Sequence, residues 1–123
     1  MIKVSNFDNI FTLHMTGDIN HVEMVHIHNT ISELIRDGHL NVIVSMDDVE
    51  HINYLSIGVL VERLKRLRNY GGDLKIVGMS HYIRNIFTVV GADEFFESFD
   101  CQEEALSSFG GNMEFQPAFA KRP

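Results

Sequence analysis

The sequence has little cysteine and no long hydrophobic run. Its single cysteine, Cys101, permits no internal disulfide, which fits a reducing compartment. No stretch approaches the roughly 18 continuous apolar residues of a membrane-spanning helix. The first eleven residues, MIKVSNFDNIF, also lack the apolar core and cleavage site of a signal peptide. We therefore expect a cytoplasmic protein that does not insert into a membrane.

Positive charge is scarce as well. The chain has 10 lysines and arginines against 17 aspartates and glutamates, which gives a formal net charge of −7. Phosphate contacts need clustered Lys and Arg side chains, so this balance argues against a nucleic-acid binder that relies on a general positive field. We expect no direct nucleic-acid partner.

Enzyme and metal signatures are also missing. No glycine cluster has the GxGxxG or GxxxxGK spacing that holds phosphates. Asp47 and Asp48 are adjacent, and adjacent acids in a turn serve more often as caps than as catalytic carboxylates. On a helix, His26 points away from His21 and His28, and no Cys–His pair has zinc spacing. The sequence therefore predicts no catalysis, no metal and no cofactor.

What the sequence does contain is enough apolar material for one packed domain. Hydrophobic residues make up 45% of the 123 residues, which is ordinary for a single globular domain of this length. We expect the domain to span residues 1–109. Residues 110–123 form a tail for which two alternatives stand, flexibility or docking on the domain or on a partner.

Apolar periodicity predicts strands that alternate with helices. Phe11, Leu13 and Met15 alternate with polar residues, as in a half-buried strand, and the run LNVIVSM is typical of a strand buried on both faces. The predicted order is ββαβαβαβα, from two strands within residues 1–16, a helix over 20–37, a strand over 40–46, a helix over 56–70, a strand over 74–79, a helix over 80–90, an edge strand over 95–99 and a helix over 100–108. This alternation requires crossover connections and a largely parallel inner sheet, which is an α/β fold.

Polar residues set the predicted boundaries of these elements. Gly17-Asp18 is expected to end the second strand. The polar residues 47–51 are expected to lie outside the third strand. Asn20, Ser56 and Ser80 are the expected N-caps of the first three helices, since their side chains accept from first-turn amides.

Together these segments resemble the STAS domain of anti-sigma factor antagonists, which is shared with sulfate transporters. The resemblance rests on VIVSMDDVEHINYLSIGVL (42–60), VERLKRLRNYGGDLKIVG (61–78) and SHYIRNIFTVVGADEFFESFDCQEEAL (80–106), in family order. It implies a single domain with a mixed sheet of about five strands and helices packed chiefly on one side.

The resemblance places the functional centre at the loop and helix start after the third strand. Typical members read Asp-Ser-Ser-Gly-Leu-Gly there, and a partner kinase phosphorylates the second serine. This chain instead has Leu55 at the position of the phosphoacceptor, so the usual serine is replaced. The partner-binding residues that the resemblance implies are Asn53, Tyr54, Leu55, Ser56, Ile57 and Gly58.

Three residues of this segment leave alternatives open. Ser56 is either an N-cap or a substitute phosphoacceptor, and its place at a helix start suits both interpretations. Tyr54 and Leu55 either pack back onto the core or remain exposed as anchors for a partner.

The helix over 56–70 also carries a basic face. Arg63, Lys65, Arg66 and Arg68 are expected to point away from its apolar side. Such a face is either merely solvated or able to steer an acidic partner. Because the resemblance places this helix beside the partner surface, Arg63 and Arg66 are included among the predicted binding residues.

The resulting hypothesis is a protein-interaction module without enzymatic activity. It would bind an anti-sigma factor or a related histidine-kinase-like ATPase domain and so regulate transcription, without the usual serine switch. The alternative is a cytoplasmic STAS subunit of a lipid-transporting ABC system. Its oligomeric state is left open between a monomer and a weak homodimer.

Overall fold

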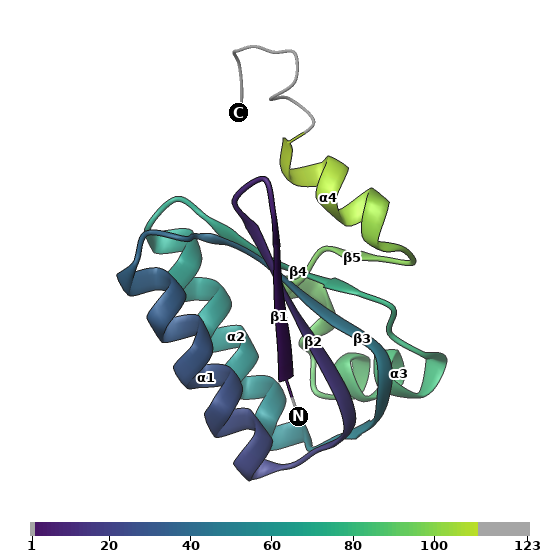
Figure 1. Ribbon diagram of the computed structural model, residues 1–123. Helices are drawn as coiled ribbons and strands as arrows, with labels where there is room; N and C mark the ends of the chain where they lie inside the picture. Colours follow the sequence, from purple (N-terminus) through teal and green to yellow (C-terminus); the bar gives the residue numbers. More distant parts are fainter. Residues whose placement is uncertain (1, 111–123) are drawn as a thin grey trace.

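A computed structural model of the protein describes residues 2–110 and contains one five-stranded sheet in the order β1-β2-β3-β4-β5 (Figure 1). β1 runs antiparallel to β2, and the other neighbours are parallel. The predicted mixed sheet and the order ββαβαβαβα are confirmed. The elements are β1 (Ile2–Phe7), β2 (Ile10–Ile19), α1 (His21–Arg36), β3 (Asn41–Ile52), α2 (Tyr54–Asn69), β4 (Asp73–Val77), α3 (His81–Val89), the 3-10 helix η1 (Asp93–Phe95), β5 (Ser98–Phe99) and α4 (Gln102–Gly110).

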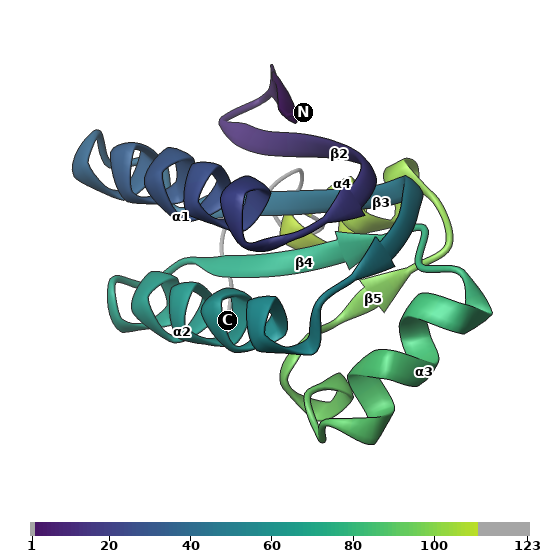
Figure 2. The ribbon, with the colours of Figure 1, turned by 90° about the horizontal axis from the view of Figure 1, so that it is seen from below.

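The strand order explains why the helices lie chiefly on one side of the sheet. From β2 to β5 every connection steps to the next strand in the same direction, and right-handed crossovers then place every connecting helix on the same face. α1, α2 and α3 accordingly share the main core (Figure 2). α4 follows the last strand, so this rule does not apply to it, and its Ala105 packs on the other face with Ile10, Ile43 and Val77.

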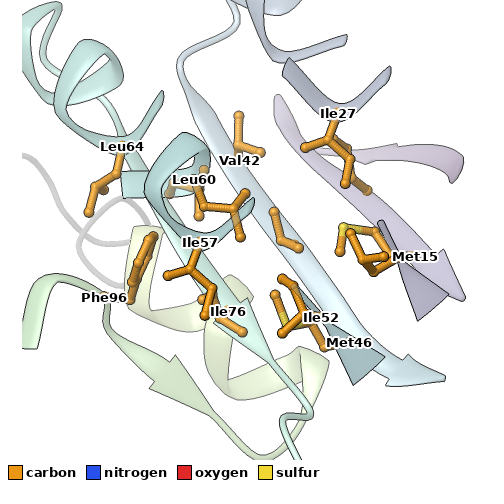
Figure 3. Packing of buried hydrophobic residues seen from close by; sticks show 14 of the residues in the cluster. Met15, Ile27, Val42, Met46, Ile52, Ile57, Leu60, Leu64, Ile76 and Phe96 are labelled. Carbon is orange, nitrogen blue, oxygen red and sulfur yellow. The ribbon is translucent and has the colours of Figure 1, made fainter. Parts of the chain in front are cut away.

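The main core fills the space between the sheet and these three helices. Figure 3 shows Ile57 and Leu60 of α2 turned toward the sheet, where they meet side chains of β3 and β4. β3 is buried on both faces from Val42 to Met46, as the LNVIVSM run predicts. This packing fixes α2 against the sheet at its first turn, because Ile57 is only 1% exposed.

The neighbouring strands β2 and β3 are longer than predicted. β2 continues through Gly17-Asp18, and β3 continues through residues 47–52, so both predicted interruptions are wrong. The two strands pair with each other over this extension, from Thr16 opposite Asp48 to Ile19 opposite Ile52, with irregular register on the way. Buried Ile19 and Ile52 anchor the extension, while its polar residues lie on the exposed side.

Helix starts agree with the sequence at two of the three predicted caps. Asn20 Oδ1 accepts from the amide of Glu23 at 3.1 Å, and Ser80 Oγ accepts from the amide of Ile83 at 3.1 Å. The edge strand is shorter than predicted, because η1 ends at Phe95 and β5 begins only at Ser98 and ends at Phe99. α4 begins at Gln102 rather than at residue 100, and the tail beyond residue 110 lies outside the described residues. Between residues 2 and 110 no helix has the length and hydropathy needed to cross a bilayer.

Candidate partner-binding site

The start of α2 is held by its own backbone and by Asn53. Asn53 is the N-cap, and its Oδ1 accepts from the amide of Leu55 at 2.8 Å. Its carbonyl oxygen also accepts from the amide of Ser56 at 2.9 Å. Buried Ile52 before the turn and buried Ile57 after it tie the segment to the core. The turn that presents Tyr54 and the residue after it is therefore fixed from both sides.

Tyr54 and Leu55 lie outside the core. Their side chains are 63% and 72% exposed, although both are large and apolar. Of the two alternatives for this pair, the structure thus shows exposure. Gly58, one turn further along α2, is exposed as well. A rigid turn with two exposed apolar side chains has the character of a protein-contact surface.

The helix α3 adds apolar residues to this surface that the sequence did not indicate. One hollow of about 350 Å³ lies between α2 and α3, and a second of about 310 Å³ continues from it toward η1. Tyr54 and Val90 line both, so we treat them as one feature, the α2–α3 groove. Its walls are Tyr54, Ile57, Gly58, Val61, Tyr82, Asn85, Ile86, Val89, Val90, Gly91, Ala92 and Phe95.

Arg63 does not belong to the exposed surface, so its predicted placement is wrong. Its side chain is only about 6% exposed and lies between α1 and α2. The guanidinium donates from Nε to Glu62 Oε1 at 2.7 Å and from Nη1 to Ser32 Oγ at 2.7 Å. Position 63 falls between the core residues Leu60 and Leu67 on the helix, which turns it toward α1.

The remaining basic residues of α2 are exposed or half-exposed. Arg66 lies 3.8 Å from Glu62, and Arg68 pairs with Asp73 at 3.0 Å. Lys65 stacks over the ring of Phe95, with 5.2 Å between Nζ and the ring centroid. The predicted basic face therefore shrinks to three side chains, of which two are already near carboxylates.

The family of the chain follows from a match that spans most of its length. The sequence model of the STAS domain matches residues 1–105. The chain belongs to the STAS domain family. Among its relatives, the TM1081 homologue of Thermotoga neapolitana is 27% identical over 79 residues, which are 64% of this chain and 70% of the relative. The anti-sigma-B factor antagonist of Staphylococcus aureus (strain NCTC 8325 / PS 47) is 21% identical over 90 residues, 73% of this chain and 83% of that protein.

Solved structures of STAS proteins have the same fold. The anti-sigma factor antagonist SpoIIAA of Bacillus, in its unphosphorylated form, superposes with a TM-score of 0.80 at 18% identity. The superposition covers 90% of this chain and 97% of SpoIIAA. This chain therefore shares the fold of SpoIIAA over most of its length.

In this STAS domain, Ser56 occupies the first turn of α2 but does not cap it. The predicted N-cap role is wrong, because Asn53 directly precedes the first helical residue and takes that role. The Ser56 side chain is about 4% exposed, beneath the turn. Phosphorylation of Ser56 stays a prediction, and it requires this first turn to open.

Arg63 also gives the STAS domain an acid-sensitive contact. Hydrogen bonds from the Arg63 guanidinium hold the pKa of Glu62 below its ordinary value. A carboxyl whose pKa is lowered by folding stabilises the fold above its unfolded pKa, about 4.3, and loses that contribution as the pH falls.

Within residues 2–110, no cluster of three metal-ligating side chains occurs.

We expect Arg63→Met to lower the free energy of unfolding by about 1 to 2 kcal/mol at pH 7. The loss should shrink below about pH 4, because protonated Glu62 gives up the same contact in the parent chain. Urea unfolding of the variant and of the parent chain, at pH 7 and below about pH 4, measures the difference in free energy of unfolding. Arg66→Met is the matched control, since Arg66 is only 3.8 Å from Glu62 and half-exposed. An equal loss at both pH values would contradict the role given to Glu62.

Proposed function

We propose that this chain is an anti-sigma factor antagonist, which binds an anti-sigma factor and thereby regulates transcription. The observation that carries the proposal is the rigid, capped start of α2, which presents Tyr54 and Leu55 to solvent. The family resemblance implies a binding centre at this position, and the Staphylococcus aureus relative is an anti-sigma-B factor antagonist. The proposed contact residues are Asn53, Tyr54, Leu55, Gly58 and Arg66. Ser56 and Ile57, also predicted from the sequence, are buried and support the turn from beneath.

The replaced phosphoacceptor gives the proposed antagonist a different mode of control. A serine at a helix start can accept a phosphate, whose charge beside the first amides then alters the binding surface. Leu55 has no hydroxyl, so a kinase cannot act at this position. We infer that the chain binds its anti-sigma factor constitutively, in the cytoplasm, and that no cofactor takes part. A partner with a histidine-kinase-like ATPase fold fits this proposal.

Tyr54→Ala tests the proposed surface. We expect the affinity for the purified anti-sigma factor of the same cells to fall by about tenfold, because a large exposed aromatic contact is lost. The melting temperature should change little, since the ring is 63% exposed. Calorimetric titration measures the first quantity and thermal unfolding the second.

Tyr70→Ala is the matched control for this experiment. Tyr70 is 57% exposed at the other end of α2 and does not line the groove. Its variant should bind as the parent chain does. Binding of the parent chain to the ATPase subunit of a lipid-transporting ABC system, and to no anti-sigma factor, would contradict the proposed function.

A further inference from the structure

The α2–α3 groove is a continuous, mainly apolar feature of the described surface. Its two hollows share Tyr54 and Val90 and together run from Tyr82 on α3 to Phe95 on η1. No charged side chain is among the residues that line them. Large exposed apolar patches on a protein often mark the sites where other proteins bind.

Large exposed apolar side chains are concentrated here. Residues 2–110 contain eleven large, exposed apolar side chains. Five of them line the groove, and a sixth, Leu55, lies beside it. Val89 is the most exposed of them, at 78%, although it lies on a helix with an otherwise strong apolar stripe. These six are Tyr54, Leu55, Tyr82, Val89, Val90 and Phe95.

The spacing of the wall residues fits a helical occupant. On α3 the lining positions are 82, 85, 86 and 89, followed by the C-cap Val90, and on α2 they are 54, 57, 58 and 61. Both sets follow the i, i+3, i+4, i+7 pattern, so each wall is a straight ridge about two turns long. A trough between two such ridges accepts the apolar face of an amphipathic helix.

Charge indicates that this helix comes from another protein. The net charge of −7 makes two copies of this chain repel each other, which disfavours a second copy as the occupant. At the Phe95 end of the groove, Lys65 contacts the aromatic ring but forms no ion pair with a carboxylate of residues 2–110. A partner helix with one acidic side chain at that end would supply the missing charge.

We propose that the α2–α3 groove binds an amphipathic helix of the partner protein, with an acidic residue of that helix against Lys65. The proposal rests on the proposed function, and it adds α3 to a binding site that the sequence limits to α2. Tyr54 then acts as the shared side chain between the turn surface and the groove. Leu55 contacts the partner outside the groove.

Photo-cross-linking from inside the groove tests this proposal in the native cells. The full chain carries benzoylphenylalanine in place of Val89, and a matched control carries it in place of Val22, which is 62% exposed on α1. After irradiation, mass spectrometry identifies the cross-linked residue in the captured protein. We expect position 89 to cross-link to the apolar face of an amphipathic helix and position 22 to give no such product.

The identity of that helix separates the two proposals. A helix of an anti-sigma factor supports both the groove and the proposed function. An amphipathic helix of another class of protein supports the groove and overturns the proposed function. Cross-links to a second copy of this chain, to a segment without helical apolar spacing, or equally from positions 89 and 22 would overturn the groove proposal.

Two substitutions in the full chain extend the test to affinity. With the cross-linked partner purified, Val89→Asp should weaken binding by at least about tenfold, and Val22→Asp by less than about twofold. Lys65→Glu should weaken binding by about fivefold, and Lys65→Arg should restore it, since arginine keeps the charge. An unchanged affinity of Val89→Asp, with an unchanged melting temperature, would overturn the proposal.

Discussion

Leu55→Asp is expected to lower the affinity for an anti-sigma factor by about 100-fold, because a carboxylate without a partner is costly to bury in an apolar contact. The side chain is 72% exposed, so the fold loses almost no buried area. An acidic residue in the first turn of a helix is also favoured by the helix dipole. The variant should therefore bind poorly and melt at or slightly above the temperature of the parent chain.

Leu55→Asn separates the charge from the lost contact. Asparagine has nearly the shape of aspartate without its charge, so this variant should lose only about tenfold in affinity. Calorimetric titration and thermal unfolding of both variants give the comparison. Equal losses for the two would show that charge at this position does not matter. Full affinity of Leu55→Asp would place the interface elsewhere on the domain.

Gly72→Ala is expected to lower the free energy of unfolding by about 3 kcal/mol, which is a large effect for one methyl group. A Cβ at this position would overlap the carbonyl oxygen and the Cβ of Leu40, and backbone atoms cannot move aside as a flexible side chain can. The contact lies where the chain enters β4. The amide of Asp73 donates to the carbonyl of Leu40 at 3.0 Å there, so relief of the overlap strains or breaks that bond.

Gly58→Ala provides a control with the opposite sign. Gly58 is inside α2, and a Cβ there would meet nothing within 4 Å. Alanine is better than glycine within a helix, so this variant should gain about 0.5 to 1 kcal/mol. Urea unfolding monitored by circular dichroism measures both variants. A neutral Gly72→Ala would mean that β3 and β4 can separate locally without loss.

The sequence predicts the parts of this fold that local patterns determine. The run LNVIVSM is dense in β-branched residues and needs no other segment to identify it as a strand. The extension of β3 was not predictable in the same way, because its polar residues become strand only by pairing with the end of β2. Arg63 shows the same limit, since its partner Ser32 is 31 positions away and only the packing of α1 on α2 brings them together.

For the candidate site, the sequence predicted the α2 turn but not the α3 residues that lie beside it. Tyr54 and Leu55 stood out because a family resemblance places the binding centre there, and the structure then showed their exposure. The α3 side of the groove has no local signal in the sequence, because Val89 looks like one more apolar helix residue. Its exposure depends on how far α3 is rotated against α2, which the spacing of residues along one helix does not determine.

The distribution of aromatic rings gives the domain an intrinsic optical reporter. The chain has no tryptophan and three tyrosines, so its near-ultraviolet emission comes from tyrosine. Two of the three, Tyr54 and Tyr82, line the groove, and the Tyr82 hydroxyl is 2.7 Å from Nδ1 of His51. A bound helix that lacks tyrosine and tryptophan would shield both rings from water, so occupancy of the groove could be followed by fluorescence without any label.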